Sequence, residues 1–354
     1  MVSRFTRTFK NLSGGLSRSR RALSHSVRLR LPLSASDLPS GTTAERSGFS
    51  GSAYTAHAER LSDRKDIELL ATADEDRKNV EAIKEVAKEA DIVFLCLPDA
   101  ASKEIMAAIG ELPCKVIDTS TAFRTAADWA YGFPELGADY KTAIATKKHI
   151  ANPGCHASGM IACIAPLVKA GLVPTEYPFT ITSLTGYSGG GKKMIGQYES
   201  EPKDYFLYAP RQYGLSQQHK HLPEVQHVCG LSEAPIFIPI VDDYYSGMEV
   251  TVGIHSRLCQ KPISIDTVQQ ALENFYKGSP IITVVPFTEN SNTGMLNANQ
   301  LSNTDSMKIY VTGNDERIMI HAIFDNLGKG ASGAAVQCMN IALGLPEDTG
   351  LALG

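Results

Sequence analysis

A cysteine stands directly after Asn-Pro-Gly and directly before an apolar run in the segment IANPGCHASGMIACIAPL at 150–167. Pro153 and Gly154 break regular structure, and apolar residues then recur at spacings of three and four, so Cys155 is predicted at a turn-to-helix junction. The free N–H groups and partial positive charge of a helix start stabilise a thiolate and can lower the pKa of a thiol. Cys155 is therefore a candidate nucleophile, and the alternative interpretation is a small buried residue.

A histidine pair could serve this thiol. His219 and His221 stand two residues apart in GLSQQHKHLPEV, and Glu224 follows them. An imidazole can move a proton during catalysis, and we favour His219 for this role, with Glu224 or His221 orienting it. Two other interpretations stay open, because HxH pairs are often ordinary loop or core histidines, and because Cys155, His219 and His221 are also metal-ligand types. We expect no metal.

Two further stretches could bind an anion. The stretch DTSTAFR at 118–124 ends in Arg124, whose planar guanidinium suits an oxyanion or a phosphate. The stretch TGYSGGGKK at 185–193 offers glycine-rich backbone N–H groups beside Lys192 and Lys193, which is a possible anion nest. The alternatives are a surface arginine and a flexible turn.

The elements that must position these residues alternate between strand-like and helix-like segments. Strand-like IELLATA, DIVFLCLP and KVIDTST are separated by helix-like segments, which predicts a parallel, doubly wound sheet. Ligands collect at the carboxyl ends of such strands, so the loops at 98–102 and 120–124 should face a binding crevice. After Gly171 the strands alternate with period two, which predicts a second, mainly antiparallel α+β domain. The helical segment at 329–345 could then pack back on the first domain.

Composition sets outer limits on the function. The chain has 354 residues, of which 43% are hydrophobic and 20% charged, and a net charge of -4, as expected of a globular chain long enough for two domains. Nothing indicates a nucleic-acid partner, and no apolar run is long enough to span a membrane. Seven cysteines lie scattered without zinc-like spacing, which is typical of reduced thiols in a cytosol-like compartment.

Several ordered motifs together carry a resemblance to a known family. They are NPGC at 152–155, VIDTSTAFR at 116–124, YGFPEL at 131–136, GYSGGGK at 186–192, HKHLPEV at 219–225, YYSGMEVTV at 244–252 and DNLGKGASGAAVQCMN at 325–340. From about Leu61 to its end the chain resembles the short bacterial type of N-acetyl-gamma-glutamyl-phosphate reductase, a relative of aspartate-semialdehyde dehydrogenases. The resemblance implies an α/β fold: a Rossmann-type, parallel-sheet NADP-binding domain with an α+β catalytic and dimerisation domain.

The resemblance also implies an activity and its residues. N-acetyl-L-glutamyl 5-phosphate would be reduced by NADPH to N-acetyl-L-glutamate 5-semialdehyde through a thioester, as a step of arginine biosynthesis in a cytoplasmic homo-oligomer, a dimer or tetramer. Cys155, His219 and His221 would be catalytic. The expected substrate-binding residues are Arg124, Lys192 and Glu224, and the expected cofactor-binding residues are Arg77, Lys78, Pro98, Ser120 and Asn326. His156 departs from the family's usual NPGCYPT, which has an aromatic phenol there.

The front of the chain departs further from this pattern. Residues 1–58 show neither a clear apolar strand nor GxGxxG, so we expect a disordered or frame-scrambled segment there. Permissible codons for residues 44–50 read in another frame as the peptide GTFGLQ, so we hypothesise a local frameshift that is restored near Ala58. The start is basic, with no acid before Asp37, and its composition resembles a mitochondrial transit peptide. We favour out-of-frame or upstream translation over that reading.

The expected domains are 1–58, 59–154 for the remainder of the dinucleotide-binding domain, 155–325 for the catalytic and dimerisation domain, and 326–354 for a helix that returns to the first domain. Other functions stay open: an aspartate-semialdehyde dehydrogenase, a cysteine hydrolase, and a folded remnant whose cofactor binding is impaired.

Overall fold

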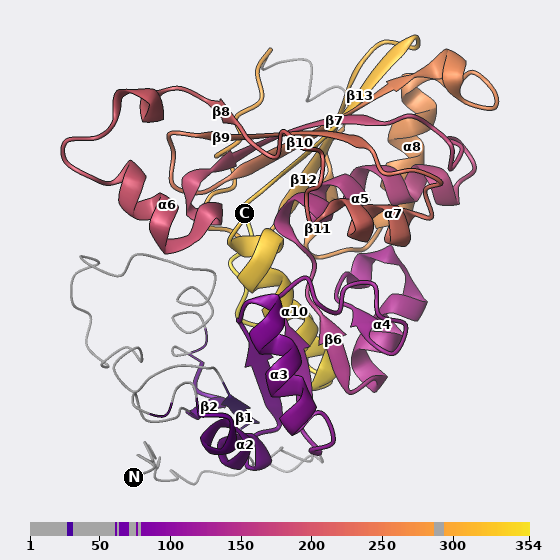
Figure 1. The fold of residues 1–354 in the computed structure, drawn as a ribbon. Coiled ribbons are helices and arrows are strands. Elements are labelled where there is room, and N and C mark those ends of the chain that lie inside the picture. The colour runs from indigo at the N-terminus through magenta and orange to yellow at the C-terminus, as the bar shows by residue number, and fades with distance from the viewer. Residues whose placement is uncertain (1–26, 31–60, 62–63, 71–75, 77–78, 287–293) are drawn as a thin grey trace, which may run out of the picture.

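A computed structural model describes residues 27–30, 61, 64–70, 76, 79–286 and 294–354. Within them the chain forms two sheets, and helix α5 (Cys155–Lys169) connects the strands of the first sheet to those of the second (Figure 1). The first sheet is parallel throughout and has the order β2-β1-β3-β4-β6-β5. Its strands are β1 (Val27–Arg30), β2 (Ile67–Leu70), β3 (Ile92–Leu95), β4 (Lys115–Asp118), β5 (Ala130–Tyr131) and β6 (His149–Ala151). The predicted parallel sheet is confirmed.

Helices cover both faces of this sheet. On one face, α2 (Val80–Lys88) and α3 (Asp99–Ile109) pack against Val93, Leu95 and Val116. On the other, α4 (Ala138–Thr146) and α10 (Gly333–Ala342) pack against Phe94, Ile117 and Ile150. All four residues of β3 are buried, as expected of a strand covered on both faces. The C-terminal helix α10 thus returns to the first sheet, as its sequence suggested.

Strand β1 lies in the stretch where the sequence showed no clear strand, and that expectation is wrong for residues 27–30. Its backbone pairs with both neighbours, Val27 with Ile67 and Leu29 with Ile92. The sequence signal was weak because arginines alternate with the apolar residues of VRLR. The proposed frameshift, the expected phosphate-binding turn, Arg77 and Lys78 lie outside the described residues, so these stay predictions.

The second sheet has seven strands in the order β11-β12-β13-β10-β7-β9-β8. Four of its pairings are antiparallel, and β7 with β9 and β11 with β12 are parallel, so the predicted mainly antiparallel domain is confirmed. The strands are β7 (Thr180–Gly186), β8 (Arg211–Gln212), β9 (Ile236–Asp242), β10 (Met248–His255), β11 (Ile282–Val284), β12 (Met307–Gly313) and β13 (Arg317–Phe324).

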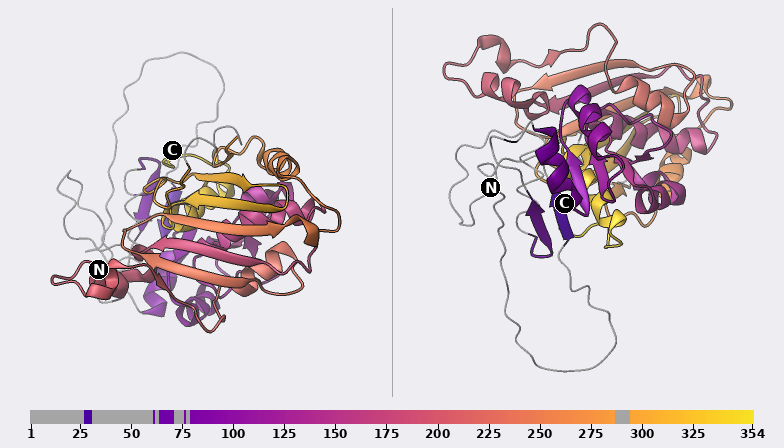
Figure 2. Two further views of the ribbon diagram at one scale, coloured as in Figure 1. Left: turned by 90° about the horizontal axis from the view of Figure 1, so that it is seen from above. Right: turned by 60° about the horizontal axis from the view of Figure 1, so that its bottom comes forward.

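One face of the second sheet carries the larger core. Three helices pack on it: α5 (Cys155–Lys169), α7 (Leu222–Cys229) and α8 (Ile265–Tyr276). Figure 2 shows the opposite face with no described helix lying across it. The remaining helices are α6 (Gly191–Tyr198) and the short turns η3 (Pro134–Leu136), η4 (Tyr187–Gly190), η5 (Tyr205–Tyr208), η6 (Ser256–Leu258) and η7 (Gly328–Ser332). The start of α5 therefore lies where the carboxyl end of β6 leads into the second sheet's core.

Candidate active site

Cys155 is the first residue of α5 and Gly154 is its N-cap, as the sequence predicted. The thiol accepts a hydrogen bond from the backbone N–H of His156. That bond and the charges of Arg124 and Lys220 act to lower the pKa of the thiol, but burial outweighs them and raises it. This direction is opposite to the lowering expected at a helix start, and its cause is burial, although the Cys155 side chain is only half-buried. A base must therefore take the proton as the sulfur attacks.

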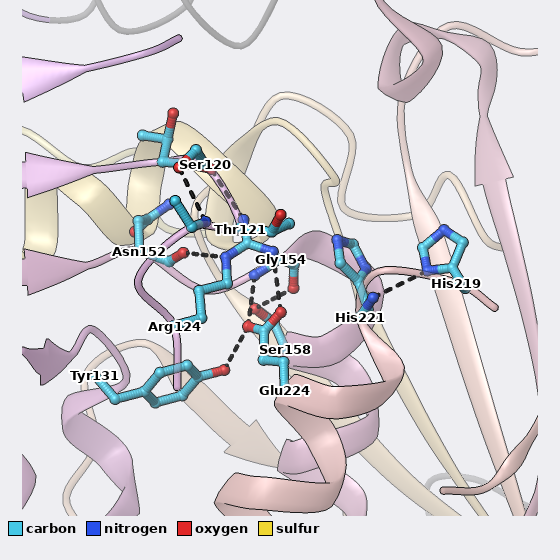
Figure 3. Close-up of polar contacts among 12 residues, drawn as sticks. Ser120, Thr121, Arg124, Tyr131, Asn152, Gly154, Ser158, His219, His221 and Glu224 are labelled. Carbon is cyan, nitrogen blue, oxygen red and sulfur yellow. Dashed lines mark hydrogen bonds and ion pairs between the residues drawn. The ribbon is translucent and has the colours of Figure 1, made fainter. Parts of the chain in front are cut away.

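The guanidinium of Arg124 is committed within the chain. Nε donates to the carbonyl oxygen of Asn152, Nη1 to Oε2 of Glu224 and Nη2 to the carbonyl oxygen of Thr119, each at 2.9 Å (Figure 3). The side chain is only 8% exposed. Arg124 therefore ties the loop after β4 to the turn before Cys155, and its expected contact with substrate has little free surface to use.

Glu224 completes this tie and has a different role from the one expected. Its Oε1 accepts hydrogen bonds from the backbone N–H of Gly154 at 2.9 Å and from the hydroxyl of Tyr131 at 2.7 Å (Figure 3). The carboxylate is buried and paired with Arg124. The prediction that it orients an imidazole is wrong, because its carboxylate oxygens accept hydrogen bonds from Arg124, Tyr131 and the Gly154 N–H, which hold the helix start. Neither Tyr131 nor Gly154 was singled out from the sequence as its partner.

His219 is half-buried and its ring is oriented by the backbone. Its Nδ1 accepts a hydrogen bond from the N–H of His221 at 3.3 Å (Figure 3). The neutral imidazole with this bond carries its hydrogen on Nε2. Burial, and then the neighbouring charge of Lys220, lowers the pKa of His219. The arrangement suits a neutral hydrogen-bond donor.

His221 lies against the turn that precedes the nucleophile. It is 4% exposed, and burial followed by the charge of Arg124 lowers its pKa well below the usual value. A Cβ atom added to Gly154 would lie 2.3 Å from Nε2 of His221, so the ring occupies the space that glycine leaves. Its Nδ1 has no hydrogen-bond partner among the described residues. The structure thus brings both predicted histidines close together, with ring centroids 4.7 Å apart.

Two residues of this site were missed or underrated by the sequence analysis. Lys220, between the two histidines, is exposed, and its charge acts on Cys155 and Asp99. His156 was noticed only as a departure from a motif, yet its ring lies 5.7 Å from those of both His219 and His221. The sequence did contain a signal for Lys220, because this lysine stands between two histidines that were already candidate catalytic residues.

Three residues expected to bind the cofactor, and one lysine expected to bind an anion, lie in three different parts of the structure. Pro98 is the N-cap of α3 after β3, and Ser120 follows β4 with its hydroxyl on the carboxylate of Asp118, so both lie at the carboxyl edge of the first sheet, as predicted. Asn326 is buried, and its amide binds the N–H of Gly247 and the hydroxyl of Ser188. Lys192 is exposed near the start of α6, after the glycine-rich turn.

The described part of the chain lacks two features. No group of three or more His, Cys, Asp and Glu side chains there could hold a metal ion. No helix there is long and apolar enough to cross a membrane.

Comparisons with known proteins assign both domains. Residues 44–143 match the NAD-binding domain of semialdehyde dehydrogenases, and residues 155–326 match their dimerisation domain. Among solved structures, aspartate semialdehyde dehydrogenase II from Vibrio cholerae is similar with a TM-score of 0.65 at 17% identity, covering 90% of this chain and 98% of that one. The Candida albicans aspartate semialdehyde dehydrogenase with NADP has a TM-score of 0.62 at 15% identity, covering 90% and 98%. These likenesses show the fold, and the first domain is of the nicotinamide-dinucleotide-binding kind.

Sequence relatives are much more similar than these structures. N-acetyl-gamma-glutamyl-phosphate reductase 2 of Nostoc sp. is 39% identical over 304 residues, which cover 82% of this chain and 94% of that protein. N-acetyl-gamma-glutamyl-phosphate reductase of Rhizobium meliloti is 41% identical over 288 residues, which cover 80% and 93%. Because this identity extends over nearly the whole length of those enzymes, the chain belongs to the N-acetyl-gamma-glutamyl-phosphate reductase family.

Proposed function

We propose that the chain reduces N-acetyl-L-glutamyl 5-phosphate to N-acetyl-L-glutamate 5-semialdehyde and phosphate, with NADPH, as a step of arginine biosynthesis. The observation that carries the proposal is the placement of Cys155 at the start of α5, beside two neutral histidines. The names of the relatives supply the substrate. The solved aspartate-semialdehyde dehydrogenases share the fold at 15–17% identity, which does not favour their substrate here.

The first step forms a thioester on Cys155. Because burial raises the pKa of the thiol, its proton leaves only as the sulfur attacks the acyl carbon. His221 is neutral and lies against Gly154, so we assign it as the acceptor of this proton. The new C–S bond replaces the C–O bond to phosphate, and phosphate leaves with the electron pair of that bond.

The second step reduces the thioester. The nicotinamide would supply a hydride to the thioester carbon, and the carbonyl oxygen would then carry negative charge. Nε2–H of neutral His219 is assigned as a hydrogen-bond donor to that oxygen. The imidazolium of His221 returns its proton to the oxygen to give the thiohemiacetal. Breaking the C–S bond then forms the aldehyde, and the hydroxyl proton passes through His221 to the sulfur, which restores the thiol.

Phosphate binding is assigned mainly to Lys220. The guanidinium of Arg124 already donates to two backbone carbonyl oxygens and to Glu224. Lys220, in contrast, is exposed, and its charge acts on Cys155. Lys192 with the glycine-rich turn remains a second proposed anion contact.

The cofactor site is proposed at the carboxyl edge of the first sheet. Dinucleotides bind at this edge in doubly wound sheets, and Pro98 is exposed there, at the start of α3. Arg77 or Lys78 would bind the 2′-phosphate that selects NADP. Asn326 would shape the site through its bonds to Gly247 and Ser188. We further propose a cytoplasmic dimer or tetramer.

Trapping the acyl-enzyme tests this proposal. The full chain is mixed with N-acetylglutamyl phosphate without NADPH, quenched in acid, and its peptides are weighed by mass spectrometry. We expect the N-acetylglutamyl mass on the peptide that contains Cys155 and its absence from Cys155→Ser. Turnover without this adduct, or an adduct on another residue, would overturn the assignment.

A further inference from the structure

A row of three hydrogen-bonded side chains lies beside the nucleophile and has no part in the chemistry above. His156 follows Cys155 and is 3% exposed. Its Nδ1 lies 2.7 Å from the hydroxyl of Ser183 on β7, and its Nε2 lies 2.6 Å from the hydroxyl of Tyr213. The row therefore joins the first turn of α5 to the second sheet and to the residue that follows β8.

The number of donors and acceptors in the row decides which group donates to which. Burial lowers the pKa of His156 to about 3, so its neutral ring offers one donor and one acceptor. If Tyr213 donated to Nε2, Nδ1–H would donate to Ser183. The hydroxyl hydrogen of Ser183, which is 0% exposed, would then lack an acceptor among the described residues. An unmade buried hydrogen bond is costly, so the opposite direction is favoured.

In the favoured direction the row ends in a free donor. Ser183 donates to Nδ1, and Nε2–H donates to the oxygen of Tyr213, which leaves the Tyr213 O–H to point elsewhere. Tyr213 is half-buried, so its hydrogen can meet a bound molecule. A hydroxyl that accepts a hydrogen bond also becomes a stronger donor, because the bonds of a chain polarise one another.

The phenol lies close to the reacting atoms. Its oxygen is bonded to the residue next to Cys155, and its ring centroid lies 6.1 Å from that of His219. The charge of Cys155 adds to burial in raising the pKa of Tyr213, which supports this closeness to the sulfur. The acyl carbon is bonded to that sulfur in the thioester, so the carbonyl oxygen forms in the same neighbourhood.

We propose that Tyr213 is a catalytic residue whose hydroxyl donates a hydrogen bond to the carbonyl oxygen of the acyl group on Cys155, with Ser183 and His156 as positioning residues. The inference rests on the proposed function. It gives the developing oxyanion a second donor beside Nε2–H of His219. The carbonyl oxygen becomes negative only during attack or hydride transfer, so a donor there stabilises the transition state more than the bound substrate. The row should therefore act on kcat rather than on KM.

A double-mutant cycle in the full chain tests the row. Tyr213→Phe, Ser183→Ala and the double variant are compared with the wild type for kcat and KM in the reduction of N-acetylglutamyl phosphate. Tyr310→Phe is the matched control, because the hydroxyl of Tyr310 also has a hydrogen-bond partner, Gln300, and Tyr310 lies in a separate apolar cluster with Leu301 and Ile323. Thermal melting of each protein reports the fold.

We expect Tyr213→Phe to lower kcat by about 10² to 10³ with little change in KM, as for other lost oxyanion donors. Ser183→Ala should lower kcat less, and the double variant should match Tyr213→Phe, because Ser183 acts only through the phenol. Effects that multiply, a loss confined to KM, or a normal kcat in Tyr213→Phe would overturn the proposal. A wild type without turnover would instead refute the proposed function, and the row with it.

Discussion

The substitution Gly154→Ala tests how tightly the nucleophile's turn is packed. A Cβ atom at this position would lie 2.3 Å from Nε2 of His221 and 2.5 Å from Nη1 of Arg124. Ordinary contacts begin at 3.4 Å, so each group would have to retreat by about 1 Å. Neither can do so freely, because His221 is 4% exposed and Arg124 holds three hydrogen bonds.

The size of the effect follows from this geometry. Overpacking of a filled interior costs about 1 to 3 kcal/mol of unfolding free energy. A catalytic group displaced by about 1 Å costs about 10² in rate. Gly154→Ala should therefore lower kcat by about 10², and the protein should remain folded but melt several degrees earlier.

The assay is steady-state oxidation of NADPH with N-acetylglutamyl phosphate, combined with thermal melting. The control is Gly196→Ala on α6, where an added Cβ meets no atom within 4 Å. This variant should keep its activity and its stability, or gain some stability, because alanine favours helices over glycine. A kcat of Gly154→Ala within a few-fold of the wild type would contradict the role of His221 as the proton acceptor that is positioned by its contact with Gly154.

Three further predictions concern the cysteines and histidines. Cys155→Ser should lower turnover by several orders of magnitude. Cys163→Ala, at a fully buried thiol on the same helix, should keep normal turnover and lose only stability. Near-normal turnover of Cys155→Ser would show that Cys155 is not the nucleophile. His219→Asn should cost about 10² to 10³ in kcat, and His219→Gln, which places an N–H near the Nε2 position, should recover part of it; equal losses would instead indicate proton transfer by His219. The pKa of His156 is about 3 in the folded protein against 6.5 in the unfolded chain, so the unfolded chain takes up the proton first as the pH falls. The stability that depends on a neutral His156 is therefore complete above pH 6.5 and is lost as the pH falls towards 3. Urea unfolding at pH 7 and pH 5 should show this loss, at up to about 1.4 kcal/mol per pH unit for each such histidine, and His156→Gln should reduce it; unfolding free energies that do not change with pH would contradict it.

Local patterns in the sequence predicted the elements and the nucleophile. The turn residues before Cys155 and the apolar spacing after it identified the start of α5, and alternation of strands and helices identified the parallel sheet. These features depend on neighbours in the chain, which a sequence shows directly. Strand β1 was missed because its apolar residues are few and alternate with arginines.

The partners within the site could not be predicted in the same way. Arg124 and Glu224 are 100 residues apart in the chain, and only the packing of α7 against α5 brings them together. The same holds for Ser183 and Tyr213, which reach His156 from the second sheet. Residue types therefore indicated the chemistry, whereas the fold decided that Arg124 and Glu224 hold the helix start instead of substrate or imidazole.

The central claim is the reduction of an N-acetylglutamyl phosphate, and the reverse reaction tests it most directly. N-acetylglutamate semialdehyde and aspartate semialdehyde are each oxidised by the full chain with NADP, with and without inorganic phosphate. We expect oxidation of the acetylated substrate only when phosphate is present, and a kcat/KM at least about 10² above that for aspartate semialdehyde. A preference for aspartate semialdehyde, or oxidation that proceeds equally without phosphate, would contradict the account.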